Sequence, residues 1–288
     1  MVSAKEIILR TISAADARRL VKALHYSHTC AANSQLHFGV FLGDRCCGAM
    51  QFGPPIMRRN MLGLVAGTPW WGMLELNRMA FAERLPRNSE SRALGVALRF
   101  IRKHYPWVQW IVSFADATRC GDGTIYRAAG FVLTQIRRNL SIWAAPGGDL
   151  FSDVGLKTGA KVRAKAMGII NQTTRTKGKH CRAARGSAGM KVFKDAGFAP
   201  LPGFQLRYIY FLDPTARARL TVPILPFSEI ARRGAGMYRG KPRAESIDTD
   251  AAAHQAAEGG VNPTSALHCR KKARRRSKAG PGGRFQDM

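Results

Sequence analysis

The strongest constraint on the fold is one apolar segment, Trp107–Phe114, that lies between two helical patterns. Before it, apolar residues recur every three or four positions from about Glu90 to Lys103, which predicts a long helix with one buried face. After it, Thr124–Ala129 has the pattern of a short helix that ends at Gly130. A strand with helices on either side in the sequence is typical of α/β proteins, whose helices cover the faces of a sheet.

Other segments extend this pattern. Ser13 is a suitable N-cap for a helix over Ala14–Leu24, and Gly43-Asp44 is a good hairpin turn between two strands. The remaining expected strands are Lys5–Arg10, His37–Leu42, Cys46–Phe52, Met73–Met79, Phe131–Ile136 and Leu206–Leu212. We therefore predict an α/β (α+β) fold with a mixed central sheet flanked by helices.

Positive charge is the main compositional signal. The 288 residues include 46 Lys+Arg and 18 Asp+Glu, which gives a net charge of +28. Such a chain attracts polyanions, with nucleic acid the first candidate and an anionic membrane surface the second. The charge is uneven, because residues 157–194 contain eleven basic side chains and no acidic one. We interpret this segment as a basic insertion.

The C-terminal part has a different composition. Almost no large apolar residue follows Tyr238, and the segment is rich in Ala, Gly and Arg. We expect a catalytic domain over residues 1–230 and a disordered basic tail over residues 231–288. The run Arg270–Arg276 can contact phosphates without specificity, or the tail can simply keep the protein soluble.

Several features indicate a cytoplasmic protein. The six Cys form no CxxC pair and no regular framework, which favours a reducing compartment. The sequence contains no run of about 18 apolar residues, so we expect no membrane span. The first residues lack the apolar region of a secretory signal, so we expect none.

Two residues near the apolar strand are candidates for chemistry. Asp116 follows the strand, where a carboxylate can accept a proton or bind a metal, although it can also cap the turn at Ala117-Thr118. Tyr126 lies on the short helix that follows. It is either a site residue or a core tyrosine with a satisfied hydroxyl.

Other motifs have similar pairs of interpretations. The segment His25–His28 can bind a metal or transfer protons, or it is a polar loop. The turn Arg87–Arg92 offers helix N–H groups beside Ser and Arg side chains, which suits a phosphate; otherwise it is an ordinary capped helix start. Arg78 can bind an anion or lie on the surface.

Together these segments resemble the Gcn5-related N-acyltransferase fold. In that family a pyrophosphate-binding turn at a helix start precedes a strand and then a helix that carries a Tyr followed by Gly-Phe. The corresponding residues here are Arg87–Arg92, Tyr126 and Gly130-Phe131, and Arg92–Ala97 matches part of the family's Gln/Arg-x-x-Gly-x-Gly/Ala motif. The resemblance implies an acyl-CoA site, with Tyr126 protonating the departing thiolate.

A narrower resemblance is to the Mom family of phage DNA-modification proteins. It rests on blocks that span about residues 20–226, namely His25-Tyr26, Leu74–Arg78, Leu85–Ser91, Ser113–Asp116, Gly123–Tyr126 and Arg207–Asp213. Members convert adenine in phage DNA to a carbamoylmethyl (acetamido-type) derivative that shields the DNA from host restriction. The resemblance therefore implies a phage or prophage enzyme that acts on adenine N6 in the cytoplasm of a bacterial host.

The resemblance also implies residue roles. The catalytic residues, which also surround a possible iron site, are His25, Tyr26, Asp116 and Tyr126. The residues tied to acetyl-CoA are Arg78, Arg87, Asn88, Ser89, Ser91 and Arg92. The basic insertion is expected to neutralise DNA phosphates, through Lys157, Lys161, Arg163, Lys165, Arg175, Lys177, Lys179, Arg182 and Arg185.

Adenine N6 is hidden inside a duplex, so an enzyme acting on it must flip the base or use unpaired DNA. Asp116 as base and Tyr126 as acid fit such a reaction. Two other functions stay open. One is an N-acetyltransferase acting on a protein or small amine, which needs the same CoA site but no DNA surface. The other is a DNA-binding protein without catalysis.

Overall fold

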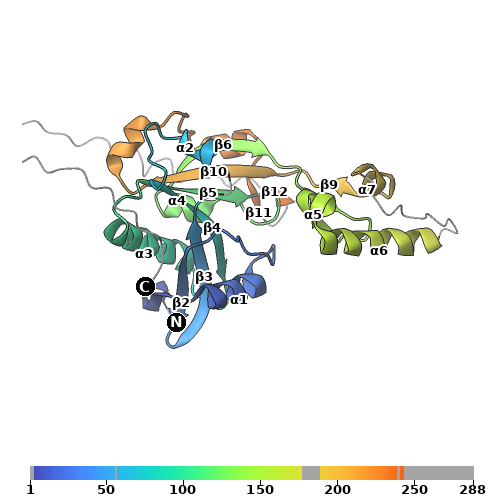
Figure 1. Ribbon diagram of the computed structural model, residues 1–288, viewed down its shortest axis with the longest axis horizontal. Coiled ribbons are helices and arrows are strands. Elements are labelled where there is room, and N and C mark those ends of the chain that lie inside the picture. Colours follow the sequence, from blue (N-terminus) through green and yellow to red (C-terminus); the bar gives the residue numbers. More distant parts are fainter. Residues whose placement is uncertain (1–2, 56, 177–188, 239–240, 243–288) are drawn as a thin grey trace, which may run out of the picture. The chain divides into compact units, whose positions relative to one another are not determined.

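The computed structural model describes residues 3–55, 57–176, 189–238 and 241–242, and the described part contains a seven-stranded sheet ordered β1-β2-β3-β4-β5-β10-β6 (Figure 1). Its strands are β1 (Ile7–Thr11), β2 (Leu36–Leu42), β3 (Arg45–Gly53), β4 (Met73–Phe81), β5 (Trp110–Asp116), β6 (Val132–Arg138) and β10 (Phe204–Phe211). Neighbouring strands are antiparallel except for the parallel pair β4 and β5. The expected mixed sheet is confirmed.

Helices connect these strands as the sequence predicts. The helices and 3₁₀ turns of this part are η1 (Ala4–Glu6), α1 (Ala14–Leu24), α2 (Arg58–Leu62), α3 (Ser89–His104) and α4 (Thr124–Ala128). The Ser13 hydroxyl caps α1 by accepting a hydrogen bond from the Asp16 N–H. The order of α3, β5 and the tyrosine-bearing α4 is the one that the acyltransferase resemblance implies.

The parallel strands β4 and β5 stay together for only three residue pairs, from Met73 with Trp110 to Glu75 with Val112. Beyond these pairs β4 continues to Phe81 and β5 to Asp116, each bonded to a different neighbour, β3 and β10 respectively. In Figure 1 the strands on the β5 side of the sheet run across the view, whereas β2 and β3 run down it. The two strands therefore diverge, and their later residues border an opening in the sheet.

The main core lies against both halves of this sheet. Its fully buried side chains include Phe38 and Phe52 from β2 and β3, Leu94 and Ile101 from α3, and Tyr208 from β10. The apolar positions of α3 point inward at the helical spacing that the sequence shows. Burial of these side chains holds α3 against the sheet beside the opening.

The basic insertion is part of a larger unit than the sequence indicates, residues 142–200, which we call the basic unit. It contains β7 (Ile142–Ala144), β8 (Leu150–Ser152), α5 (Asp153–Thr158), α6 (Ala160–Thr176), α7 (Lys191–Asp195) and β9 (Ala199–Pro200). Trp143, Phe151, Phe193 and Phe198 form a small core of their own in it. Most of these aromatic residues lie outside residues 157–194, so a boundary drawn on charge alone misses them.

The described chain also extends past residue 230, where we placed the end of the folded domain. After η2 (Pro214–Arg219) and α8 (Ser228–Arg232), the short strands β11 (Met237–Tyr238) and β12 (Lys241–Pro242) pair with each other. Ala235 and Met237 are buried in the main core, which explains the extension. The rest of the expected tail, residues 243–288, lies outside the described residues. No helix in the described ranges is long and apolar enough to cross a membrane.

The turn before α4 depends on a glycine. Gly123 has a positive φ of 88°, and a Cβ there would collide with the ring of Tyr208, whose hydroxyl donates to the Asp122 carbonyl at 2.5 Å. Gly148 has a similar φ of 87° but nothing within 4 Å of a Cβ. A comparison of substitutions at the two glycines therefore separates the cost of a left-handed backbone from the cost of a collision with Tyr208.

We expect Gly148→Ala to lower the free energy of unfolding by about 1–2 kcal/mol, the cost of a left-handed conformation for a residue with a Cβ. Gly123→Ala should cost a further ~1–3 kcal/mol because the ring of Tyr208 must move. Chemical denaturation of the two variants beside the wild type measures both. Equal losses would show that the packing of Tyr208 against Gly123 contributes nothing.

Candidate functional site

Polar side chains from several elements gather where β4 and β5 separate. Charge interactions and ring contacts connect them with one another. We call them the polar cluster: His25, Tyr26, Glu75, Arg78, Ser113, Asp116, Arg119, Cys120 and Tyr126. The structure thus brings together the four residues for which the sequence predicts catalytic roles.

Asp116 lies at the end of β5 with one carboxylate oxygen engaged. Its Oδ1 accepts hydrogen bonds from the Thr118 N–H at 3.1 Å and from Asn139 Nδ2 at 3.3 Å. Oδ2 accepts none within the part of the chain that the structure describes. The capping interpretation therefore holds for one oxygen, and the other stays available to accept a proton.

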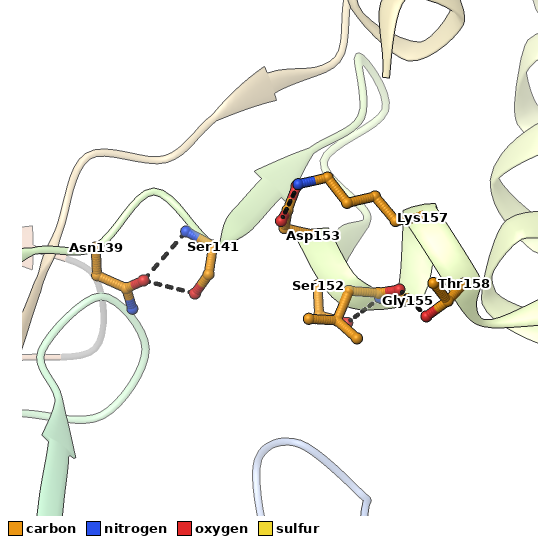
Figure 2. A network of polar contacts seen from close by, with 8 residues as sticks. Asn139, Ser141, Ser152, Asp153, Gly155, Lys157 and Thr158 are labelled. Atoms are coloured by element: carbon orange, nitrogen blue, oxygen red, sulfur yellow. Dashed lines mark hydrogen bonds and ion pairs between the residues drawn. The ribbon is translucent and has the colours of Figure 1, made fainter. Parts of the chain in front are cut away.

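Asn139 is the partner that sequence analysis missed. Its side chain is buried, and its Oδ1 accepts from the Ser141 N–H at 3.1 Å and the Ser141 hydroxyl at 2.5 Å (Figure 2). The Ser141 carbonyl in turn accepts from the Asp153 N–H at 2.7 Å, at the start of α5. Asn139 therefore joins Asp116 to the first turn of the basic unit.

Tyr126 projects from α4 with its ring 5.5 Å from that of Phe131 and 5.3 Å from that of Tyr208. Burial raises the pKa of Tyr126 to about 12, with the nearby Glu75 carboxylate adding to the rise and Ser113 opposing it. Burial also raises the pKa of Glu75. Tyr126 therefore keeps its proton at neutral pH and is placed to donate it.

His25 and Tyr26 come from the loop after α1, with ring centroids 4.2 Å apart. Burial, followed by the charges of Arg78, His28 and Arg119, lowers the pKa of His25 to about 4. Its Nδ1 accepts from the Ser27 N–H at 3.1 Å, which fits a neutral imidazole. Burial and the Asp116 charge raise the pKa of Tyr26, and the Arg119 guanidinium lies 5.3 Å from its ring.

These surroundings do not fit the iron that the family resemblance implies. The guanidinium groups of Arg78 and Arg119 lie beside His25 and Tyr26 and repel a cation. Nδ1 of His25 accepts a hydrogen bond from the Ser27 N–H, so the proton of the neutral ring lies on Nε2 and leaves no free nitrogen lone pair for a metal. Across the described ranges, no three His, Cys, Asp or Glu side chains gather as metal ligands. We therefore derive no step through iron.

A cavity of about 440 Å³ lies at the start of α3. Its lining includes three of the predicted acetyl-CoA residues, Asn88, Ser91 and Arg92. Asn88 has a left-handed φ of 68°, and no side chain caps the helix. The Ser89 N–H donates to the Pro86 carbonyl at 3.1 Å, and the N–H groups of Glu90 and Ser91 that follow can meet an anion. The side chain of Arg92 adds positive charge at the same turn.

The other predicted acetyl-CoA residues lie elsewhere. Arg87 is exposed and does not line the cavity. Ser89 is buried, with a hydroxyl that has no partner in the described structure. Arg78 belongs to the polar cluster, where it donates to the carbonyls of Thr29 at 3.0 Å and Asn77 at 2.6 Å.

The predicted DNA-binding residues of the basic unit are only partly described. Lys157 pairs with Asp153 at 2.7 Å (Figure 2), and Lys165 pairs with Asp149 at 2.9 Å. Lys161 is exposed. Arg163 is half-buried and donates to the Leu156 carbonyl at 2.9 Å. The remaining side chains lie outside the described residues: Arg175, Lys177, Lys179, Arg182 and Arg185.

Comparisons with known proteins place these observations in a family. The model of the Mom protein family matches residues 6–229. The chain is 34% identical over 221 residues to "Methylcarbamoylase mom" of Escherichia phage Mu, an alignment that covers 76% of this chain and 81% of that protein. The family resemblance that the sequence motifs show is thereby confirmed.

Solved structures with related architecture include two acetyltransferases. An IAA acetyltransferase from Bacillus cereus is 10% identical, with a TM-score of 0.37 over 71% of this chain and 99% of that one. The spermidine/spermine N-acetyltransferase SpeG from Vibrio cholerae is 8% identical, with a TM-score of 0.38 over 75% and 98%.

The lowered pKa of His25 predicts a pH dependence of stability. Between pH 6.5 and about 4 the unfolded chain binds a proton at His25 that the folded protein does not. The free energy of unfolding should therefore fall as the pH falls through this range. His25→Asn keeps a hydrogen-bond acceptor near the position of Nδ1 but does not titrate. Its free energy of unfolding should therefore fall less between pH 7 and pH 5 than that of the wild type, as measured by urea denaturation at each pH.

The matched control is His104→Asn, at the exposed end of α3. It should show the same fall as the wild type. A fall in His25→Asn as large as in the wild type would contradict the assignment of the pH dependence to His25.

Proposed function

The chain belongs to the Mom protein family, and from that premise we propose that it is an enzyme that modifies adenine in DNA at N6. The product would be a carbamoylmethyl (acetamido-type) adenine that protects phage DNA from restriction in the cytoplasm of a bacterial host. The observation that carries the proposal is the polar cluster, in which Tyr26 interacts with both Asp116 and Tyr126 where β4 and β5 separate. The name of the phage Mu relative, a methylcarbamoylase, supports the class of group transferred.

The cluster supplies the two proton transfers that such a reaction needs. Asp116 Oδ2 accepts the proton that leaves adenine N6 as the new bond to nitrogen forms. Tyr126 is protonated at neutral pH because burial raises its pKa, and it gives this phenolic proton to the departing group. Asn139 and the Thr118 N–H hold the Asp116 carboxylate in one orientation during the transfer.

The cluster lies among half-buried side chains, so a paired adenine inside a duplex does not reach it. The proposed reaction therefore requires a flipped or unpaired adenine. Neutral His25 and protonated Tyr26 provide hydrogen-bonding groups next to Asp116 that can contact the edge of that base.

The cavity at the start of α3 fits acetyl-CoA. Its uncapped helix N–H groups, Ser91 and Arg92 are suited to a pyrophosphate, and Ala128 and Ala129 continue the lining toward α4, which carries Tyr126. Acetyl-CoA bound there would supply a two-carbon group, and cleavage of its thioester by an amine would release the CoA thiolate, which Tyr126 would protonate. The carbamoylmethyl product requires in addition a nitrogen donor for the amide and a bond from N6 to the methyl carbon.

We assign DNA backbone contacts to the basic unit. Exposed ion pairs such as that of Lys165 with Asp149 contribute little to folding, so their lysines can exchange partners for phosphates at small cost. The hydrogen bonds through Asn139 and Ser141 place this unit next to Asp116. Binding of a duplex to the unit would therefore bring DNA to the polar cluster.

The two proposed catalytic groups can be tested with nearly isosteric changes. Asp116→Asn keeps an Oδ1 acceptor but removes the base, and Tyr126→Phe removes only the hydroxyl. Each should reduce DNA modification by about 100-fold or more, because a positioned acid or base typically contributes that much. Mass spectrometry of nucleosides from the DNA of expressing cells measures the modified deoxyadenosine.

The control for this experiment is Asp44→Asn, an exposed residue of the turn between β2 and β3, which should leave modification unchanged. Modified adenine at wild-type levels in Asp116→Asn would remove Asp116 from the mechanism. Unmodified adenine with the folded wild-type protein would contradict the proposed function and favour an acetyltransferase acting on another amine.

The acetyl-CoA cavity can be tested at Gly95, which lines it in the middle of α3. Gly95→Leu should raise the free energy of unfolding by about 0.5–1 kcal/mol through helix propensity, yet abolish acetyl-CoA binding by filling the cavity. Gly95→Ala should stabilise similarly and still bind, because the nearest atom to its Cβ is Arg99 Nη1 at 3.7 Å. Isothermal titration calorimetry measures acetyl-CoA binding by the two variants, and thermal denaturation measures their stability. Wild-type binding by Gly95→Leu would mean that the cavity is not the acetyl-CoA site.

A further inference from the structure

A second cavity, of about 450 Å³, lies in the segment between β3 and β4. Its lining residues are Pro54, Pro55, Met57, Arg58, Arg59, Asn60 and Trp70. The cavity begins directly after Gly53, which pairs with Glu75 of the polar cluster. Asn33 donates a hydrogen bond to the Pro54 carbonyl and holds this border in place. The cavity is therefore next to the polar cluster but is not part of it.

A stack of side chains borders this cavity. The Arg58 guanidinium lies 4.8 Å from the Trp70 ring and 4.7 Å from the Trp71 ring. Arg58 is only 8% exposed, whereas Trp70 and Trp71 are 47% and 53% exposed. The cation is buried by the two indoles, and each indole leaves much of its surface in contact with water.

In this arrangement one hydrogen-bond donor has no partner within the described structure, and two aromatic surfaces stay exposed. Arg58 Nε is buried and has no hydrogen-bond partner within the described structure, although a buried donor without an acceptor is costly. Two half-exposed tryptophans side by side are also unusual on a surface that only meets water. A ligand with a flat face would cover the exposed indoles, and a hydrogen-bond acceptor on it would pair with Arg58 once that side chain turns toward the ligand.

An unpaired nucleobase has this combination of properties. Its π face stacks on indole rings, and its ring nitrogens and carbonyl oxygens accept hydrogen bonds. Arg59 and Asn60 are exposed on the same segment, where a positive charge and an amide can contact the phosphate that follows the base. The net charge of +28 favours a polyanion over an apolar protein partner.

We propose that Trp70 and Trp71, held by Arg58, form a stacking site for an unpaired nucleobase of the DNA substrate, with the adjoining phosphate on Arg59. This inference rests on the proposed function, because it takes DNA as the substrate. A base flipped into the polar cluster leaves the strand locally unstacked. A stacking site at the border of the cluster compensates for the lost base stacking and selects DNA that is already open.

The test compares two fluorescent DNA duplexes of one sequence, one fully paired and one with a single unpaired adenine. Fluorescence anisotropy at a fixed salt concentration gives the affinity for each. The wild type should prefer the unpaired site. Trp70→Ala and Trp71→Ala should each weaken binding to it by at least about fivefold, the lower end of the effect of removing one stacking aromatic, with little change for the paired duplex.

Trp107→Ala is the matched control, because Trp107 has the same 47% exposure as Trp70 but lies in the turn before β5. It should bind both duplexes as the wild type does. Trp71→Leu keeps much of the apolar volume and serves if an alanine variant fails to fold. Arg59→Gln leaves the stack intact and should reduce the slope of log affinity against log salt by about one.

The outcomes separate this inference from the proposed function. If the tryptophan variants bind the unpaired site as tightly as the wild type, the stacking site is refuted, even where nucleoside mass spectrometry shows that adenine is modified. If the wild type neither modifies nor binds DNA, the proposed function fails and the stacking site fails with it. A selective loss of binding at the unpaired site supports the inference.

Discussion

The early separation of β4 from β5 is the constraint on which the rest of the site depends. Each strand keeps a hydrogen-bonded neighbour on its other edge, so the sheet stays continuous although the pair is joined over three residues only. Past the paired positions, Tyr26 from the loop after α1 interacts with Asp116 of β5, and Tyr126 from α4 interacts with Glu75 of β4. Helix α3 connects the two strands, and the cavity at its start is also lined by Ala128 and Ala129, close in the chain to Tyr126 of the polar cluster.

Local signals predicted the parts of the fold that local physics decides. The Ser13 cap, the turn at Gly43-Asp44 and the helical spacing of α3 all appear in the structure at or within a residue or two of their expected places. The roles of Arg119 and Asn139 could not be predicted, because they arise from contacts between segments that are distant in the chain. The small core of the basic unit was hidden for the same reason, since its aromatic residues come from both ends of the insertion.

The electrostatics of the polar cluster differ from those of the whole chain. A strongly basic protein holds His25 uncharged because burial and the charges of Arg78, His28 and Arg119 lower its pKa, and it keeps Tyr126 protonated because burial raises its pKa. Arg78 and Arg119 supply positive charge next to these neutral groups. Such a site favours electron-rich ligands and proton transfer, and it disfavours a bound cation. In the proposed function the net charge attracts DNA, whereas the proton transfers depend on a few groups whose protonation is controlled by their local surroundings.

The separate core of the basic unit has a consequence for how this protein can diverge. Substitutions around Phe151 or Phe193 are far from the packing of α3, so their effects on stability should add independently of those in the main core. Substitutions in the core of the outer unit can then leave the packing of the inner domain intact. The requirement that links them is modest, namely an amide at position 139 that serves both Asp116 and Ser141. A single amide side chain thus connects two modules whose hydrophobic cores are separate.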